Sequence, residues 1–307
     1  MTPATFLPSA NAAPAGVSPA GLIRQLRRYP PVNFGRYLKF IVADQHVGWV
    51  QREFTDHLRA FPQVFDLDSA HVRLQNRLAD FEARSAAMAE VLEAWRDQGL
   101  VPGWRHEFYP VARGFDLPPL LRMERAATPL FGVLSYGVNV NGLVGSGNDL
   151  RVWIGRRSPS KQVDPNMLDL LVGGGQPMGI SVWDNLQKEC REEAGIAPEM
   201  ARRARPASVI TLMIEAPEGL RVGLKFNYDL VLPADFTPRN TDGEVAEFRL
   251  MPVAELIDNL RSADAFMYDI ALVQIDLLVR YGYIGPEDPD YLTLIAGLRQ
   301  AIPFDPS

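Results

Sequence analysis

Three glutamates lie close together in the second half of the chain, at Glu189, Glu192 and Glu193. The spacings i, i+3 and i+4 place their carboxyl groups on one side of a helix. Like charges at these spacings repel one another, and the C-terminal end of a helix is itself negative, so the arrangement is unfavourable without a cation. Hard cations such as Mg²⁺ or Mn²⁺ select carboxylate and carbonyl oxygens. The triplet therefore predicts a divalent metal site, and the alternative is a solvated acidic helix face.

The surrounding sequence predicts the helix that carries these glutamates. Ser181 followed by Asp184 forms an N-terminal capping box, and Gly195 is a natural C-terminal stop, so the helix is about thirteen residues long. Gly173, Gly174 and Gly175 precede it, and glycines let backbone groups approach an ion or a diphosphate closely. Apolar residues form a stripe along the helix, namely Val182, Leu186, Cys190 and, slightly off axis, Trp183.

The distribution of histidine and cysteine excludes other kinds of catalytic site. All four histidines lie at or before His106, and Cys190 is the only cysteine. The C-terminal part of the chain therefore cannot by itself form a Ser-His-Asp triad, a Cys-His pair or an imidazole-bound zinc site. A single cysteine also excludes intramolecular disulfides and Cys-rich zinc sites, and it fits a reducing compartment.

The composition limits which binding partners and which cellular location are expected for the protein. The 307 residues are 47% hydrophobic and 22% charged, with a net charge of −6, which argues for an ordinary folded protein and against a nucleic-acid duplex as partner. No membrane span is predicted, because Gln274 and Asp276 interrupt the most apolar segment, residues 270–279. The first residues lack a charged leader and a continuous apolar block, so no secretion signal is predicted and the cytoplasm is the expected location.

Changes along the sequence predict a tail and two domains. Residues 1–18 are rich in Ala and Pro with almost no charge, which is typical of a flexible tail. Residues 19–125 are predicted to form a smaller α+β domain, with an apolar run at residues 37–49 and a helix over residues 80–98. Prolines and charges around residues 117–129 mark the boundary, and residues 126–307 form the second domain.

The second domain is predicted to be of the α/β class, with hairpins followed by helices. The hairpins join residues 131–144 to 150–154 and residues 208–216 to 220–232. In the last of these strands, alternate residues from Val222 to Leu232 share one face. After Pro252 the pattern is helical to the end, with helices over residues 268–280 and 289–301.

The segment Gly174 to Ile196 resembles the Nudix box, G-x5-E-x7-R-E-U-x-E-E-x-G-U, where U is aliphatic. The matching residues are Gly174, Glu189, Cys190, Glu192, Glu193, Gly195 and Ile196. Ile180 replaces the first glutamate of the box and Lys188 replaces its arginine. In many family members these two side chains look like partners, so the departures bear on the orientation of Glu189 more than on metal binding. The resemblance implies a Nudix α/β/α sandwich with a mixed sheet, and a metal-dependent hydrolase of diphosphates.

A narrower resemblance covers residues 20 to about 295 and concerns the Nudix subgroup related to thiamine pyrophosphokinase fusion proteins. It is carried by Phe131-Gly132, the segment Tyr136 to Gly142, the segment Arg156 to Gln162, Gly174 to Pro177, and Arg280 to Tyr283. Members of the subgroup have an extra N-terminal domain, and the resemblance implies hydrolysis of thiamine diphosphate, or its oxo and oxy analogues, to the monophosphate. Asn139 departs from a histidine associated with that site. Family analogy also makes a homodimer plausible.

The resemblance implies roles for particular residues. Glu189, Glu192 and Glu193 are the expected Mg²⁺ or Mn²⁺ ligands, together with the backbone carbonyl of Gly174 or Gly173. The expected base that deprotonates the attacking water is Glu189, Glu244 or Glu247, although the latter two also fit a solvated loop. Other residues are candidates for binding the substrate. Phosphate is expected to contact Arg156, Arg157 and Lys161, with a charged turn as the alternative. A heterocycle is expected to stack on Trp153, Phe226 or Tyr228, and the residues expected to close over the substrate are Trp49, Trp104, Tyr109 and Arg113, with packing in the core as the alternative for these aromatic residues.

Three functions remain open from the sequence. The first is a metal-dependent diphosphohydrolase of thiamine diphosphate or its analogues. The second is cleavage of a nucleoside diphosphate derivative, such as a nucleotide sugar or a dinucleotide. The third is a degenerate Nudix domain that binds a phosphorylated metabolite without turnover, which the replacements at Ile180 and Lys188 would allow.

Overall fold

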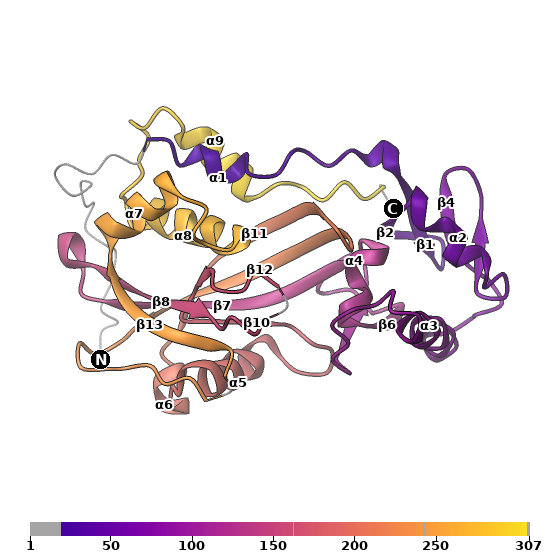
Figure 1. The fold of residues 1–307 in the computed structure, drawn as a ribbon, viewed down its shortest axis with the longest axis horizontal. Helices are drawn as coiled ribbons and strands as arrows, with labels where there is room; N and C mark the ends of the chain where they lie inside the picture. Colours follow the sequence, from indigo (N-terminus) through magenta and orange to yellow (C-terminus); the bar gives the residue numbers. More distant parts are fainter. Residues whose placement is uncertain (1–19, 162, 242, 306–307) are drawn as a thin grey trace.

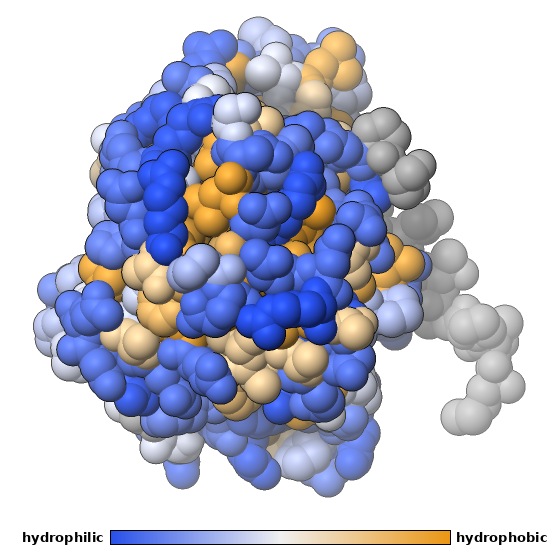
Figure 2. Space-filling view, turned by 90° about the vertical axis from the view of Figure 1, so that its right-hand side faces the viewer, coloured by the Kyte–Doolittle hydropathy of each residue, from blue (hydrophilic) through white to orange (hydrophobic). Residues whose placement is uncertain are grey.

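The computed structural model describes residues 20–161, 163–241 and 243–305, which Figure 1 shows as two sheet-containing parts side by side. The tail predicted for residues 1–18 lies outside the described residues. We call residues 34–133 the N-terminal part and residues 134–298 the C-terminal part. Figure 2 looks onto the end of the molecule formed by the N-terminal part, where hydrophobic patches are interspersed among hydrophilic side chains.

The N-terminal part is an α+β unit built on a small sheet. Its sheet has the order β2-β1-β4-β3, and a separate hairpin joins β5 to β6. The strands are β1 (Tyr37–Val42), β2 (Gln45–Gln51), β3 (Phe65–Leu67), β4 (His71–Leu74), β5 (Phe108–Val111) and β6 (Leu121–Glu124). The helices are α2 (Thr55–Arg59), α3 (Phe81–Asp97) and α4 (Thr128–Phe131). A common hydrophobic cluster extends through Val133, so the packing of this part continues past the predicted boundary at residue 125.

Helix α3 confirms the helix predicted over residues 80–98. Asp80 caps its first turn, because the Asp80 carboxylate accepts a hydrogen bond from the backbone N–H of Ala83 at 2.8 Å. Met88, Val91 and Trp95 form the buried side of the helix. After the helix, Gly99 takes a positive φ of 76°, which favours glycine and lets the chain turn away.

The C-terminal part contains a seven-stranded mixed sheet in the order β11-β12-β7-β8-β13, with β10 paired to β7 and β9 paired to β8. Its strands are β7 (Leu134–Val144), β8 (Arg151–Arg157), β9 (Leu168–Asp169), β10 (Val172–Gly175), β11 (Arg205–Ala216), β12 (Gly219–Val231) and β13 (Val245–Pro252). Both predicted hairpins are confirmed, since β7 pairs with β8 and β11 with β12 in antiparallel fashion. Strand β7 starts at Leu134 and not at residue 131 as predicted, because Gly132 ends α4 with a φ of 53°.

Helices cover both faces of this sheet, which confirms the α/β/α sandwich (Figure 1). Helices α5 (Val182–Ala194) and α6 (Pro198–Ala201) lie on one face, and α7 (Val253–Ser262), α8 (Tyr268–Arg280) and α9 (Tyr291–Leu298) lie on the other. Helix α8 has the predicted bounds. Helix α9 is shorter than predicted, because Arg299 leaves the helical conformation with φ −133° and ψ 52°.

The two ends of the described chain each pack on the part that is distant in sequence. Helix α1 (Ile23–Leu26) lies beside α7, α8 and α9, and Gln25 donates a hydrogen bond to the carbonyl of Leu260 at 2.6 Å. At the other end, Phe304 stacks on Trp49 with ring centroids 4.9 Å apart. The expectation of a helix to the very end of the chain is therefore wrong for residues 299–305, which extend along the molecule to reach the N-terminal sheet.

Within the part of the chain that the structure describes, no helix is both long and apolar enough to cross a membrane.

Candidate active site

Helix α5 carries the three glutamates and has the predicted ends. The Ser181 hydroxyl accepts a hydrogen bond from the backbone N–H of Asp184 at 3.0 Å and donates one to its carboxylate at 2.6 Å. At the other end, Gly195 adopts the left-handed conformation with φ 61°. Leu186 and Cys190 are buried against the sheet, which turns Glu189 and Glu193 toward its edge. Local sequence signals therefore fix the orientation of the acidic helix.

The three glycines, together with Val172, form strand β10, which we call the glycine strand, beside this helix. They pair with β7 in antiparallel register, Gly173 opposite Asn139 and Gly175 opposite Gly137. A methyl group at Gly174 would lie 2.4 Å from the carboxyl carbon of Glu189. Glycine at residue 174 thus lets the Glu189 carboxylate rest directly on the backbone there.

Glu193 is the most buried of the three glutamates and binds the same strand. Its side chain is 8% exposed and accepts a hydrogen bond from the backbone N–H of Gly173 at 2.7 Å. Burial raises the pKa of Glu193 well above its usual range, and the negative charges of Asp169, Glu189 and Glu244 raise it further. Burial also raises the pKa of Glu189. Two carboxyl groups are therefore held in a setting where negative charge is unfavourable.

Glu192 is more exposed than Glu193, and it shares the ammonium group of Lys188 with Glu189. The Lys188 ammonium lies 3.1 Å from the Glu189 carboxylate and 3.3 Å from that of Glu192, and Arg191 contacts Glu192 at 3.2 Å. Among the described residues, no group of three or more His, Cys, Asp or Glu side chains is close enough together to form a metal site. The three glutamates thus line one side of α5 without converging, and Lys188 lies between two of them.

The donor chemistry of these residues nevertheless fits a hard divalent cation. Glu189 and Glu193 are oxygen donors whose pKa values are raised by burial, so a cation between them would relieve an unfavourable charge. The backbone of Gly173 and Gly174 is open to a close approach because neither residue carries a side chain. The residues present are therefore suited to Mg²⁺ or Mn²⁺.

The predicted phosphate-binding residues are separated into two groups and are all paired. Arg157 contacts Asp169 at 2.8 Å, and Lys161 contacts Glu244 at 2.6 Å. A methyl group at Gly173 would lie 3.9 Å from the Asp169 carboxylate, which places this first group beside the glycine strand. Sequence analysis missed Asp169, which lies in the short strand β9, because a single carboxylate in an apolar stretch gives no signal.

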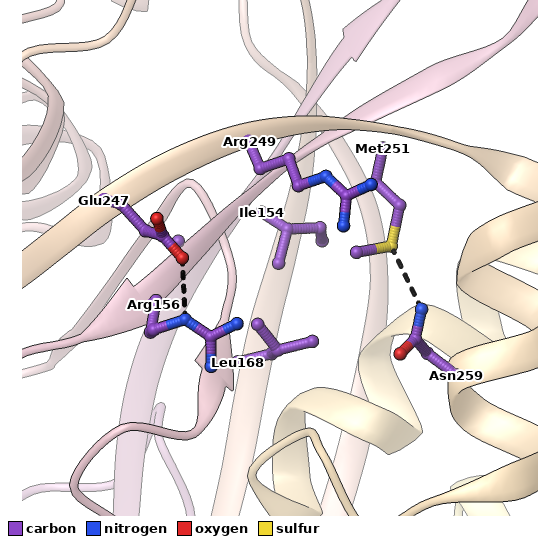
Figure 3. Close-up of a pocket in the computed structure, with 8 residues that line it drawn as sticks. Ile154, Arg156, Leu168, Glu247, Arg249, Met251 and Asn259 are labelled. Atoms are coloured by element: carbon purple, nitrogen blue, oxygen red, sulfur yellow. Dashed lines mark hydrogen bonds and ion pairs between the residues drawn. The ribbon is translucent and has the colours of Figure 1, made fainter.

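The second group is Arg156 with Glu247, which face a different place. Their side chains pair at 2.7 Å beside a small hollow of about 60 Å³ that Met251 and Asn259 also line (Figure 3). Arg156 and Arg157 point to opposite sides of β8 because successive residues of a strand alternate. The structure thus brings Arg157, Lys161 and Glu244 together and leaves Arg156 and Glu247 out of that group.

The candidate aromatic residues differ in exposure. Trp153 is 9% exposed and packs in the core beneath α5. Phe226 and Tyr136 stack with centroids 6.0 Å apart, and Phe115, which is 49% exposed, meets both edge-on. Tyr228 lies near Trp183 of α5. Phe115 is therefore the exposed member of an aromatic cluster, which we call the Phe115 cluster, formed with Tyr136 and Phe226.

Of the N-terminal candidates, Tyr109 alone contacts the glycine strand. Trp49 stacks on Phe304, Arg113 donates to the backbone carbonyl of Asp305, and Trp104 lies under Arg96. The Tyr109 hydroxyl, by contrast, lies against Gly175, where a methyl group would be only 1.6 Å away.

Sequence analysis also missed residues that support Gly175. Asn185 of α5 is fully buried and donates a hydrogen bond to the Gly175 carbonyl at 2.8 Å. Arg125 and Glu107 pair at 2.8 Å beside Tyr109. Asn185 could have been suspected as a polar residue on the inner side of a helix. The other two carry no signal, because the contact joins segments some fifty residues apart or more.

Comparisons with known proteins place this geometry in context. A family model described as "Domain of unknown function (DUF4743)" matches residues 20–135. "Nudix hydrolase 20, chloroplastic" of Arabidopsis thaliana is 40% identical over 276 residues, which is 87% of this chain and 74% of the relative. "Nudix hydrolase 24, chloroplastic" of the same plant is 42% identical over 269 residues, again 87% and 74%. The solved structure of DR0079 from Deinococcus radiodurans is 25% identical, with a TM-score of 0.37, and the match covers 45% of this chain and 80% of that one.

The names of the plant relatives correct one prediction. Both are designated chloroplastic, which overturns the expectation that a cytoplasmic location follows from the sequence.

Proposed function

The chain belongs to the Nudix hydrolase family, and we propose that it is a divalent-metal-dependent diphosphohydrolase that converts thiamine diphosphate, or its oxo and oxy analogues, to the monophosphate. The observation that carries the proposal is the seating of two acidic side chains on the glycine strand. Glu189 rests on Gly174, and Glu193 accepts the N–H of Gly173 at 2.7 Å.

In the proposed site, Glu189, Glu192 and Glu193 would hold Mg²⁺ or Mn²⁺ together with the carbonyl of Gly174 or Gly173. When bound, such a cation supplies positive charge to the phosphate oxygens on which negative charge builds up as the anhydride bond breaks. Lys188 compensates part of the charge of Glu189 and Glu192 in the protein alone, at 3.1 and 3.3 Å. Its flexible stem allows the ammonium to move aside, or to contact the substrate as a point charge.

Position favours Glu189 as the base that takes the proton of the attacking water, since all three candidates are ion-paired, Glu189 itself with Lys188 at 3.1 Å. Glu244 is bound to Lys161 at 2.6 Å, and Glu247 is bound to Arg156 at 2.7 Å beside the separate hollow. Glu189 lies on the glycine strand and has a pKa that burial raises. A carboxylate in such a setting accepts a proton more readily than an ordinary one.

The substrate class is supported by the aromatic residues near the strand. The backbone N–H of Gln176, which follows β10, donates to the carbonyl of Tyr136 at 2.9 Å, and Tyr136 belongs to the Phe115 cluster. A heterocycle stacked on Phe115 would therefore lie close to the segment that follows the glycines. This fits a compact molecule in which an aromatic heterocycle is joined to a diphosphate.

The proposal is tested by a phosphate-release assay on the full chain with Mg²⁺. The substrates are thiamine diphosphate, oxythiamine diphosphate, ADP-ribose and NADH, and product analysis identifies the monophosphate. We expect turnover of the thiamine compounds above that of the nucleotides. Faster cleavage of ADP-ribose or NADH would instead assign the enzyme to nucleoside diphosphate derivatives, and binding of every compound without cleavage would assign it to a binding module.

Glu193→Gln tests the assignment of the site in the same assay. It keeps the shape of the side chain and an oxygen that accepts the Gly173 N–H, but it removes the charge. We expect turnover to fall by at least about 10²-fold, as for the loss of other electrostatic groups in an active site, while circular dichroism shows an intact fold. Unchanged activity in this variant would contradict the site assignment.

A further inference from the structure

A hairpin of the N-terminal part touches the candidate active site. The backbone N–H of Met178, three residues beyond the glycine strand, donates a hydrogen bond to the carbonyl of Phe108 in β5 at 2.9 Å. The next residue, Tyr109, reaches the strand itself. The hairpin of β5 and β6 is therefore joined to the glycine segment through both backbone and side chain.

The Tyr109 side chain packs directly on the last glycine. It is 4% exposed, and a methyl group at Gly175 would lie 1.6 Å from its hydroxyl oxygen and 2.9 Å from the ring carbon that bears it. Asn185 donates a hydrogen bond to the carbonyl of the same glycine at 2.8 Å. The end of β10 is thus clamped between a residue of the N-terminal part and a residue of the acidic helix.

Arg125 completes this contact with a positive charge. Its guanidinium carbon lies 5.8 Å from the centre of the Tyr109 ring and 3.4 Å from where a methyl group at Gly175 would be. Glu107 orients it through an ion pair at 2.8 Å and through a backbone hydrogen bond of the same length. Arg125 therefore lies against Gly175, the residue that follows Gly174, on which the Glu189 carboxylate rests.

Helix α5 alone supplies Glu189 with a limited set of partners. Lys188 is its only ion-pair partner within the described residues, and the same ammonium also serves Glu192. Ile180, just before the helix, is apolar and adds no polar contact from its side chain. Arg125 adds a second positive charge from outside the helix, at the adjoining end of the glycine strand.

We propose that the hairpin of β5 and β6 is part of the active site, with Tyr109 and Arg125 acting as positioning residues that fix the glycine strand and, through it, the carboxylate of Glu189. The N-terminal part then has a catalytic purpose, and residues 134–298 alone would form an incomplete site. This inference rests on the proposed metal site at Glu189.

The test compares Arg125→Ala with Arg122→Ala in the full chain. Arg122 is the matched control, since it lies in β6 three residues before Arg125, pairs with Glu82 at 3.2 Å and lies over the Phe81 ring at 5.7 Å, away from the glycines. We measure kcat and KM for the substrate that the wild type cleaves, the Kd for Mn²⁺ by isothermal titration calorimetry, and Tm. Mutation of a residue that positions a metal ligand typically lowers the affinity for the metal, or the activity, about 10–100-fold.

We expect Arg125→Ala to lower kcat about 10–100-fold with KM nearly unchanged, to weaken Mn²⁺ binding, and to shift Tm no more than Arg122→Ala does. Arg125→Lys keeps the charge and should lie between Arg125→Ala and the wild type. Equal kcat and Mn²⁺ affinity in the Arg125→Ala and Arg122→Ala variants would overturn the inference. The Mn²⁺ measurement needs no substrate, so it decides the role of Arg125 even if thiamine diphosphate is not cleaved.

A second experiment tests the contact itself through a double-mutant cycle. Gly175→Ala should reduce both Tm and kcat in the wild-type background, because the new methyl group meets the Tyr109 hydroxyl. In the Tyr109→Ala background that obstacle is gone, and the same substitution should have a much smaller effect. Equal effects in both backgrounds would show that Tyr109 does not define the position of Gly175.

Discussion

Gly174→Ala is expected to displace the Glu189 carboxylate while leaving the fold in place. The added methyl carbon would lie 2.4 Å from the Glu189 carboxyl carbon and 2.6 Å from one of its oxygens. Ordinary contacts between such atoms are about 3.5–4.0 Å, so the carboxylate must retreat by about 1 Å or more. A misplacement of this size can reduce the rate about 10²-fold.

The stability of this variant should change little, which separates the effect from unfolding. Gly174 is not among the glycines with a positive φ, so alanine fits its backbone. The obstacle is the end of a flexible side chain, and we expect a loss of about 1 kcal/mol, the lower end of the range for overpacking. The assay measures kcat/KM with Mg²⁺, the Kd for Mn²⁺ and Tm.

Gly285→Ala is the control, since no atom lies within 4 Å of the methyl group it would add and its φ is not positive. It should behave as the wild type in all three measurements. If Gly174→Ala keeps the wild-type kcat/KM and Mn²⁺ affinity in a folded protein, the carboxylate of Glu189 does not need its seat on the glycine strand, and the reasoning about the site is refuted.

Three further predictions concern stability, measured by thermal and urea unfolding. Burial lowers the pKa of His46, whose ring accepts a hydrogen bond from the backbone N–H of Asp305 at 3.2 Å, so the unfolded chain binds the proton more readily than the folded one. The wild type should therefore lose stability as the pH falls below about 6.5, the ordinary histidine pKa, and His46→Gln should lose less. A fall of equal size in both proteins would contradict this. Phe304→Ala should lower the free energy of unfolding by about 1–3 kcal/mol and change Trp49 fluorescence, because the stacked ring is lost; an unchanged Tm would show that the contact does not hold the chain end. Asp80→Ala should cost about 1 kcal/mol through loss of the helix cap, and Asp80→Asn, which can still cap, should cost less.

The parts of the structure that follow from local sequence could be predicted. The capping box at Ser181, the left-handed stop at Gly195 and the apolar stripe define α5 within a residue, because each signal acts over a few neighbouring positions. The hairpins follow in the same way from alternation and turns. The helix that carries the three glutamates, together with its bounds, therefore follows from the sequence.

The contacts that complete the site could not be predicted, because they join segments far apart in the chain. Tyr109 was one of several aromatic candidates, and nothing in its neighbourhood indicates that it meets Gly175. The alternation of β8 was visible in the sequence, yet Arg156 and Arg157 were treated as one basic group, whereas the strand sends them to opposite sides. Pairing partners of charged residues depend on the register of neighbouring strands, which a single sequence does not determine.

The packing of each chain end on the opposite part limits how the molecule can move. Helix α1 binds the helices of the C-terminal part, and Phe304 binds the sheet of the N-terminal part, so contacts at both ends of the described residues join the two parts. A hinge motion that separates the N-terminal part from the C-terminal part would have to break both contacts. We therefore expect substrate entry and product exit to involve movements of exposed side chains such as Lys188 and Phe115, with both end contacts kept.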